Sequence, residues 1–220
     1  IPTDCLALAL KQALPDASSL CLGFESHSIK SPGTAKTTVE GIGTGNRIRR
    51  DGKLRSEPIG LRARNIDFGK GSRLAAAFPW GDVSTAFKTT GIPSITVFVA
   101  VTRGFRWAML ASNLLAPLLR LPAIRDRMLA NAGAAIGPDA AARQNAPTYL
   151  WGEVRNPSGE IRTARIRTAN GYEVTIHGAL AVLRHIMGRA NFAPGFVTPA
   201  LLCGATLIEQ LPGSGNIEFA

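Results

Sequence analysis

The stretch SRLAAAFPWGDVSTAFKTTGIPSITVFVAV, residues 72–101, decides the fold class, because it encodes a strand, a turn, a helix and a second strand. Its apolar start predicts a strand, which the turn sequence Pro-Trp-Gly-Asp at 79–82 would end. Asp82 can cap a helix over 83–90, and the Gly-Ile-Pro that follows would end this helix. Residues 95–101 (ITVFVAV) are β-branched and apolar on both faces. We therefore expect them to form a buried, central strand.

Further short elements are predicted on both sides of this stretch, from apolar periodicity and turn residues. Hairpin signals outnumber βαβ order, so we predict an α+β fold, with a mixed, largely antiparallel sheet and helices packed on one face. Residues 47–72 are expected to be turn-rich, and 130–147, rich in Ala, Gly and Pro, to form a mobile loop. The other predictions are helices over 4–14, within 31–46, over 176–188 and over 199–209, strands over 18–24, 149–155 and 160–168, turns at 51–52 and 156–159, and an edge strand in 216–220.

Composition limits the classes of function open to this chain. It has 220 residues, of which 45% are hydrophobic, and a formal net charge of +10. The 19 arginines and six lysines are spread along the chain without a zinc spacing or another nucleic-acid signature, so we expect no nucleic-acid partner. Three distant cysteines predict neither a disulfide framework nor a metal site, and they fit a reducing cytoplasm.

Residues 105–119 (FRWAMLASNLLAPLL) are apolar almost all round. The run is too short to span a bilayer, and Pro117 would kink a helix there. Two interpretations stay open. The helix packs against the sheet or in a dimer interface, or it lies in a membrane surface, with Phe105 and Trp107 inserted and arginines on either side. A peripheral membrane contact through this segment would make the protein membrane-associated.

Three stretches carry a resemblance to a known family. They are IPTDCLAL at 1–8, the stretch from Asp67 to Phe98, and RTANGYEVT at 167–175 together with GFVTPALLCGATLIEQLPGSG at 195–215. In this order they resemble the part of saccharopine dehydrogenase-like oxidoreductases that follows the Rossmann domain. The resemblance covers nearly the whole chain, and 103–147 is its least informative part.

The resemblance implies one domain over 1–220, which binds a small-molecule substrate and forms a homodimer within a two-domain oxidoreductase. NAD or NADP would be held by an N-terminal dinucleotide-binding domain, which we expect to be missing from this chain. No Gly-x-Gly-x-x-Gly turn follows a predicted strand, so we expect no tight NAD(P) binding and no activity from this chain alone. Alternatives are a binding or interaction module without catalysis, and a peripheral membrane protein. The substrate and the catalytic residue stay unknown.

Several polar or aromatic residues are candidates for substrate binding, each with a structural alternative. Asp82 would bind an amine or a water, or cap its helix, and Trp80 would stack on a ring or fill an apolar gap. His177 is a candidate acid or base because its ordinary pKa lies near neutrality, and His27 has a weaker case. The remaining candidates are Thr89, Thr90 and Thr198, which are alternatively turn or helix caps, and Thr3 and Asp4, which lie at the domain junction and would contact the cofactor.

Overall fold

A mixed, open sheet organises the described part of the chain, which comprises residues 1–134, 136, 137, 139, 146–188 and 195–220 of a computed structural model. Seven of its nine strands follow the order β3-β2-β6-β1-β7-β8-β9, and the other two form the β4–β5 hairpin, which pairs with β6 through β5. β1 and β6 are parallel, and the other pairs are antiparallel. The strands are β1 (Ser19–Ser26), β2 (Asn46–Arg50), β3 (Lys53–Glu57), β4 (Ala63–Asp67), β5 (Ser72–Ala77), β6 (Ser94–Ala100), β7 (Thr148–Arg155), β8 (Ile161–Thr168) and β9 (Glu218–Phe219).

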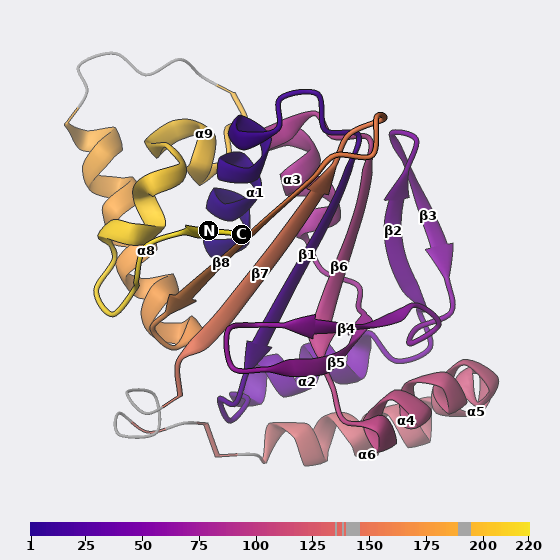
Figure 1. The fold of residues 1–220 in the computed structure, drawn as a ribbon. Helices are drawn as coiled ribbons and strands as arrows, with labels where there is room; N and C mark the ends of the chain where they lie inside the picture. Colours follow the sequence, from indigo (N-terminus) through magenta and orange to yellow (C-terminus); the bar gives the residue numbers. More distant parts are fainter. Residues whose placement is uncertain (135, 138, 140–145, 189–194) are drawn as a thin grey trace.

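The helices form two groups around this sheet (Figure 1). One group covers one face of the sheet: α1 and α3 lie against the strands, and α8, α9 and the 3₁₀ helix η1 lie beside α1. The other group, α2 and α4 to α6, lies at the end of the sheet where β1 and β6 finish. The helices are α1 (Pro2–Ala13), α2 (Pro32–Glu40), α3 (Asp82–Thr90), α4 (Arg103–Leu114), α5 (Ala116–Leu119), α6 (Pro122–Gly133), α8 (Gly171–Met187), α9 (Pro199–Cys203) and η1 (Ala205–Gln210).

The main apolar core lies between α1 and the sheet. Leu20 and Leu22 of β1 face this core, as do Leu6 and Leu10 of α1, and all four are at most 1% exposed. Gly152 of β7 lets the helix approach closely, since a Cβ there would lie 2.4 Å from Leu10 Cδ1. The absence of a side chain at this glycine therefore sets the distance between helix and sheet.

A second, smaller core lies on the opposite face of the sheet, under the β4–β5 hairpin. Ile66 and Phe68 pack there with Trp151 and Phe98. Gly23 of β1 allows this contact, because a Cβ would lie 3.3 Å from both Ile66 and Phe68. Side chains alternate along a strand, so the odd-numbered positions of β1 face the hairpin and the even-numbered ones face α1.

The predicted α+β class and the mixed, mostly antiparallel sheet are confirmed. Ser31 caps α2 through a hydrogen bond from the Thr34 amide, and the tail pairs with β8 as β9. The turn at 51–52 is also confirmed: Asp51 and Gly52 have φ of 51° and 76°.

Other predictions were wrong in detail. Gly81, not Asp82, is the N-cap of α3, because Asp82 is the first helical residue and its side chain turns toward α1. The turn-rich segment 47–72 contains the strand β4, which the pairing with β5 stabilises. The loop expected over 130–147 begins later, since α6 continues to Gly133; its residues 135, 138 and 140–145 lie outside the described residues. Gly204, with φ of 90°, divides the last predicted helix into α9 and η1.

Candidate functional site

Five of the residues singled out from the sequence form one buried polar cluster on the helical face of the sheet. The Thr3 hydroxyl donates to Asp82 Oδ1 at 2.7 Å, which joins α1 to α3. The Thr89 hydroxyl donates to Asp4 Oδ1 and lies 2.7 Å from the Thr198 hydroxyl. The Ala200 amide donates to Asp4 Oδ2 at 2.9 Å. The cluster therefore connects the starts of α1 and α9 with both ends of α3.

The electrostatics of this cluster follow from its burial. Each of its five side chains belongs to a residue less than a tenth exposed. Burial raises the pKa of Asp82 above its ordinary value, and the hydrogen bond from Thr3 only partly opposes this. The cluster residues do not line the cavity at the end of β1 and β6, and they mainly satisfy one another. Their arrangement is that of a structural anchor between helices.

Three more sequence candidates, Trp80, Thr90 and His177, are placed elsewhere. Trp80 packs against Phe24 with ring centroids 4.8 Å apart. The Thr90 hydroxyl donates to the Ala86 carbonyl oxygen at 2.6 Å, which is a bond within its own helix. His177 lies on α8, with Nε2 3.9 Å from Glu173 Oε2, and its side chain is 41% exposed. The structure therefore does not bring these residues together with one another or with the cluster.

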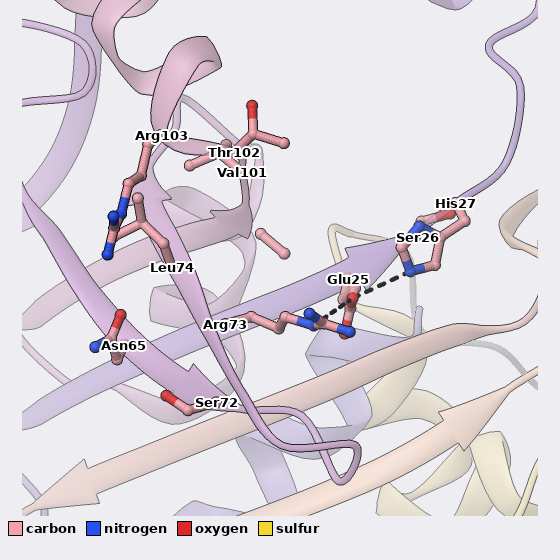
Figure 2. A pocket seen from close by; sticks show the side chains of 11 residues that line it. Glu25, Ser26, His27, Asn65, Ser72, Arg73, Leu74, Val101, Thr102 and Arg103 are labelled. Atoms are coloured by element: carbon pink, nitrogen blue, oxygen red, sulfur yellow. Dashed lines mark hydrogen bonds and ion pairs between the residues drawn. The ribbon is translucent and has the colours of Figure 1, made fainter.

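A cavity of about 960 Å³ lies on the opposite face, at the carboxyl ends of β1 and β6 (Figure 2). The two strands run parallel and side by side, so their ends open at the same edge of the sheet, and β5 crosses beside them. Ligands commonly bind at the carboxyl ends of parallel strands. The cavity is lined by Glu25, Ser26, His27, Asn65, Ser72, Arg73, Leu74, Ala100, Val101, Thr102 and Arg103.

Glu25 is the central ionisable group of this cavity. It is 5% exposed, because it is the residue on β1 whose side chain points to the hairpin face just before the strand ends. Its Oε1 lies 3.1 Å from His27 Nε2 and 3.6 Å from Arg73 Nε, and Figure 2 shows both side chains converging on the carboxylate. Its Oε2 is buried and has no hydrogen-bond partner among the described residues.

An unsatisfied buried carboxylate oxygen is unfavourable in a folded protein, and a bound ligand can satisfy it. A ligand N–H or O–H group would donate to Glu25 Oε2. Arg73 and Arg103 add two guanidinium groups to the same cavity, and such groups bind carboxylates or phosphates through paired hydrogen bonds. The arrangement therefore suits a polar ligand that carries both a donor group and an anionic group.

Neither a metal site nor a reactive thiol at Cys5 or Cys21 is indicated in the described part of the chain. No group of three or more His, Cys, Asp and Glu side chains among these residues is arranged to hold a metal ion. Burial raises the pKa of the Cys5 thiol to about 12 and that of the Cys21 thiol to about 11, so both stay protonated near neutral pH.

The residues that line the cavity were mostly missed by sequence reasoning, which gave His27 only a weak case and did not consider Glu25 or Arg73. One signal was available: Glu25 follows the apolar run from Leu20 to Phe24, and a charged residue at the end of a buried strand is unusual. The position of Arg73 had no such signal, because it depends on where β5 crosses the sheet.

Comparison with known proteins supports a likeness of fold. No protein family and no curated protein matches the sequence. A solved structure of apo, histidine-tagged saccharopine dehydrogenase (L-Glu forming) from Saccharomyces cerevisiae matches with a TM-score of 0.52 and 8% identity. The match covers 98% of this chain and 71% of that chain. The fold of this chain is therefore similar to that of saccharopine dehydrogenase.

Proposed function

We propose that these residues form the substrate-binding and dimerisation domain of an NAD(P)-dependent oxidoreductase of the saccharopine dehydrogenase-like kind. The likeness of fold supports the enzyme class. The observation that carries the proposal is the buried Glu25 Oε2, which has no hydrogen-bond partner among the described residues and belongs to a residue that lines a large cavity. A structural carboxylate would be expected to have both oxygens satisfied, and a substrate-binding one needs an oxygen left for its ligand.

In this proposal the domain orients the substrate for hydride transfer. Glu25 accepts a hydrogen bond from the substrate amine or hydroxyl, and Arg73 binds its carboxylate. The sequence contains no glycine-rich dinucleotide turn after a strand, so the nicotinamide, NAD or NADP, would be held by protein outside these residues. The cofactor supplies the hydride, and the domain supplies the geometry.

The surface proposed for dimerisation is an apolar stripe on α8. Ile176, Leu180, Leu183 and Met187 recur at intervals of four, three and four residues, and each is more than 40% exposed. This spacing places them along one side of the helix, as in the seam between two packed helices. Two antiparallel copies of the stripe would bury each other's apolar side chains in an isologous contact.

Calorimetric titration with saccharopine and with L-glutamate tests the substrate site. We expect binding to the wild-type chain, and Glu25→Gln to weaken it roughly tenfold or more, because a hydrogen bond to a charged group contributes about 1.5–3 kcal/mol. Glu160→Gln is the matched control, since Glu160 pairs with Arg162 at 2.6 Å on the surface. The control should bind as the wild type does. Titration with NADPH alone should show no tight binding.

Two outcomes would contradict the proposal. One is equal binding by the Glu25→Gln variant and the wild type. The other is a bound probe that shifts the amide resonances of Asp82 and Thr89 and leaves those of Glu25 and Arg73 unchanged. The second result would move the ligand site to the helical face of the sheet.

A further inference from the structure

We propose that the exposed apolar face of α4 and α5 binds the surface of an anionic membrane. This docking face consists of Trp107, Leu114, Leu115, Leu118 and Leu121, each at least 48% exposed. Trp107 and Leu114 are seven residues apart in α4, two turns of the helix, so they lie on the same side. They are 69% and 85% exposed, so most of each residue is left uncovered by the rest of the described chain.

Contacts on the opposite side of α4 fix the direction of this face. Met109 is 5% exposed and packs against the loop before β4, where a Cβ on Gly60 would lie 3.1 Å from Met109 Cβ. Asn113 exchanges two hydrogen bonds of 3.0 Å with the backbone of Ile59. Arg106 Nε donates to the Gly60 carbonyl oxygen at 3.1 Å. These contacts hold α4 through the side that carries Arg106, Met109 and Asn113, and they leave Trp107 and Leu114 outward.

The composition of the face fits a membrane surface rather than a membrane span. No helix in the described part of the chain is long and apolar enough to cross a bilayer. A short helix with aromatic and leucine side chains on one face lies within the headgroup region instead, where tryptophan is favoured. An apolar patch of several large side chains on a monomer surface commonly marks such a contact.

The positive charge around the docking face favours an anionic membrane over a second copy of the chain as the binding partner. The segment 103–133 contains five arginines and one acidic residue, Asp126. Arg103 lies at the start of α4, and Arg125 and Arg127 lie on α6, all exposed. In a symmetric contact these cations would face their own copies and repel, whereas lipid phosphates would attract them. The net charge of +10 adds a long-range attraction in the same direction.

Docking would also place the cavity near the membrane surface. Thr102 caps α4 through a hydrogen bond from the Phe105 amide, and Thr102 and Arg103 line the cavity. The start of the docking helix is therefore one wall of the cavity. The proposal does not depend on what the cavity binds, because the exposed apolar side chains of the docking face, and Arg125 and Arg127 on α6, are not among the residues that line it.

Flotation with phosphatidylcholine vesicles, with and without phosphatidylglycerol, tests the proposal. The wild-type chain should float with the anionic vesicles and be released by high salt, since the attraction of the arginines is screened. The double variant Trp107→Glu with Leu114→Glu should bind roughly tenfold or more weakly, because it removes inserted apolar area and adds negative charge. Leu54→Glu is the matched control: Leu54 is 49% exposed on β3, and its change should leave flotation nearly unaltered.

Tryptophan fluorescence gives a second readout in the same samples. Trp107 should shift to the blue on addition of anionic vesicles and be quenched by brominated lipid, which a folding defect in the variant would not reproduce. Absence of flotation by the wild type, or equal flotation by the double variant, would overturn the proposal. It would also be overturned if sedimentation showed a wild-type dimer that the double variant loses, with no vesicle binding by either protein.

Discussion

The hydroxyl of Thr89 is expected to stabilise the fold by joining three segments that are distant in sequence. It donates to Asp4 on α1 and lies within hydrogen-bond distance of Thr198 before α9. Thr89→Val keeps the shape of the side chain and removes both bonds, together with the contact of the hydroxyl with the Thr85 carbonyl oxygen at 3.1 Å. A hydrogen bond to a buried charged group contributes about 1.5–3 kcal/mol to stability, and a neutral one about 1 kcal/mol. The buried methyl group of the valine offsets part of this, so we expect the free energy of unfolding to fall by about 2–3 kcal/mol.

Urea denaturation followed by circular dichroism measures this loss as a change in the free energy of unfolding. Thr85→Val is the control on the same helix: its hydroxyl donates only to the Gly81 carbonyl oxygen at a long 3.4 Å, and we expect a change within about 0.5 kcal/mol. In an Asp4→Asn background, Thr89→Val should cost about 1 kcal/mol less, because the two residues are coupled. A Thr89→Val variant as stable as the wild type would refute the anchoring role of the cluster.

Two further predictions concern α8 and Asp82. If the α8 stripe forms a dimer, Leu183→Glu should convert the sedimenting species from dimer to monomer, and a wild-type monomer would remove that part of the proposal. The pKa of Asp82 is raised in the fold, so the folded state binds more protons and stability falls as pH rises through the window above the ordinary value. Asp82→Asn should therefore be at least as stable as the wild type at neutral pH, and this advantage should vanish below about pH 4 in urea titrations. A variant that loses stability relative to the wild type as pH rises would contradict this.

Local signals in the sequence predicted the elements that depend on local chemistry. Ser31 and Thr34 were both possible caps for the helix predicted within 31–46, and Ser31 is the cap because its oxygen accepts from the Thr34 amide, three residues ahead. Asp51-Gly52 predicts the β2–β3 turn because both residues tolerate positive φ. The buried strand β6 was recognisable because apolar, β-branched residues on both faces need cover on both sides.

Elements that depend on tertiary contact were not predictable in the same way. The sequence of β4 is typical of a charged turn, since two of its five residues are Arg64 and Asp67. It forms a strand because β5 supplies its partner. Arg64 is held there by a bidentate pair with Glu153 of β7, at 3.0 Å for each bond. The N-cap prediction for Asp82 failed for a similar reason, since the Thr3 hydroxyl of a distant helix competes for its carboxylate.

The candidate site shows a more general limit. Polar residues near turns, such as Thr3, Asp4 and Thr198, are equally typical of active sites and of helix junctions, and here they satisfy one another. A cavity arises where strands cross, and its lining comes from four segments that no sequence spacing relates. Side chains alternate between the two faces of the sheet along β1, so Phe24 and Glu25 lie on opposite faces although they are neighbours in sequence.

The residues that anchor the helices and those proposed to bind the ligand therefore lie on opposite faces of the sheet. Two variants can test these two roles separately. Trp80, two residues before Asp82, packs on the ring of Phe24, so the contact reaches the neighbour of Glu25 in β1. Thr89→Val should lower the free energy of unfolding and leave ligand affinity nearly unchanged, because the α3 anchor does not reach the cavity. Glu25→Gln should weaken ligand binding and change the free energy of unfolding less, since the ion pairs it weakens, with His27 and Arg73, have partner side chains that are more than half exposed. If both variants altered both quantities to a similar degree, the two faces would be coupled through β1, and the cavity could not be treated as an independent site.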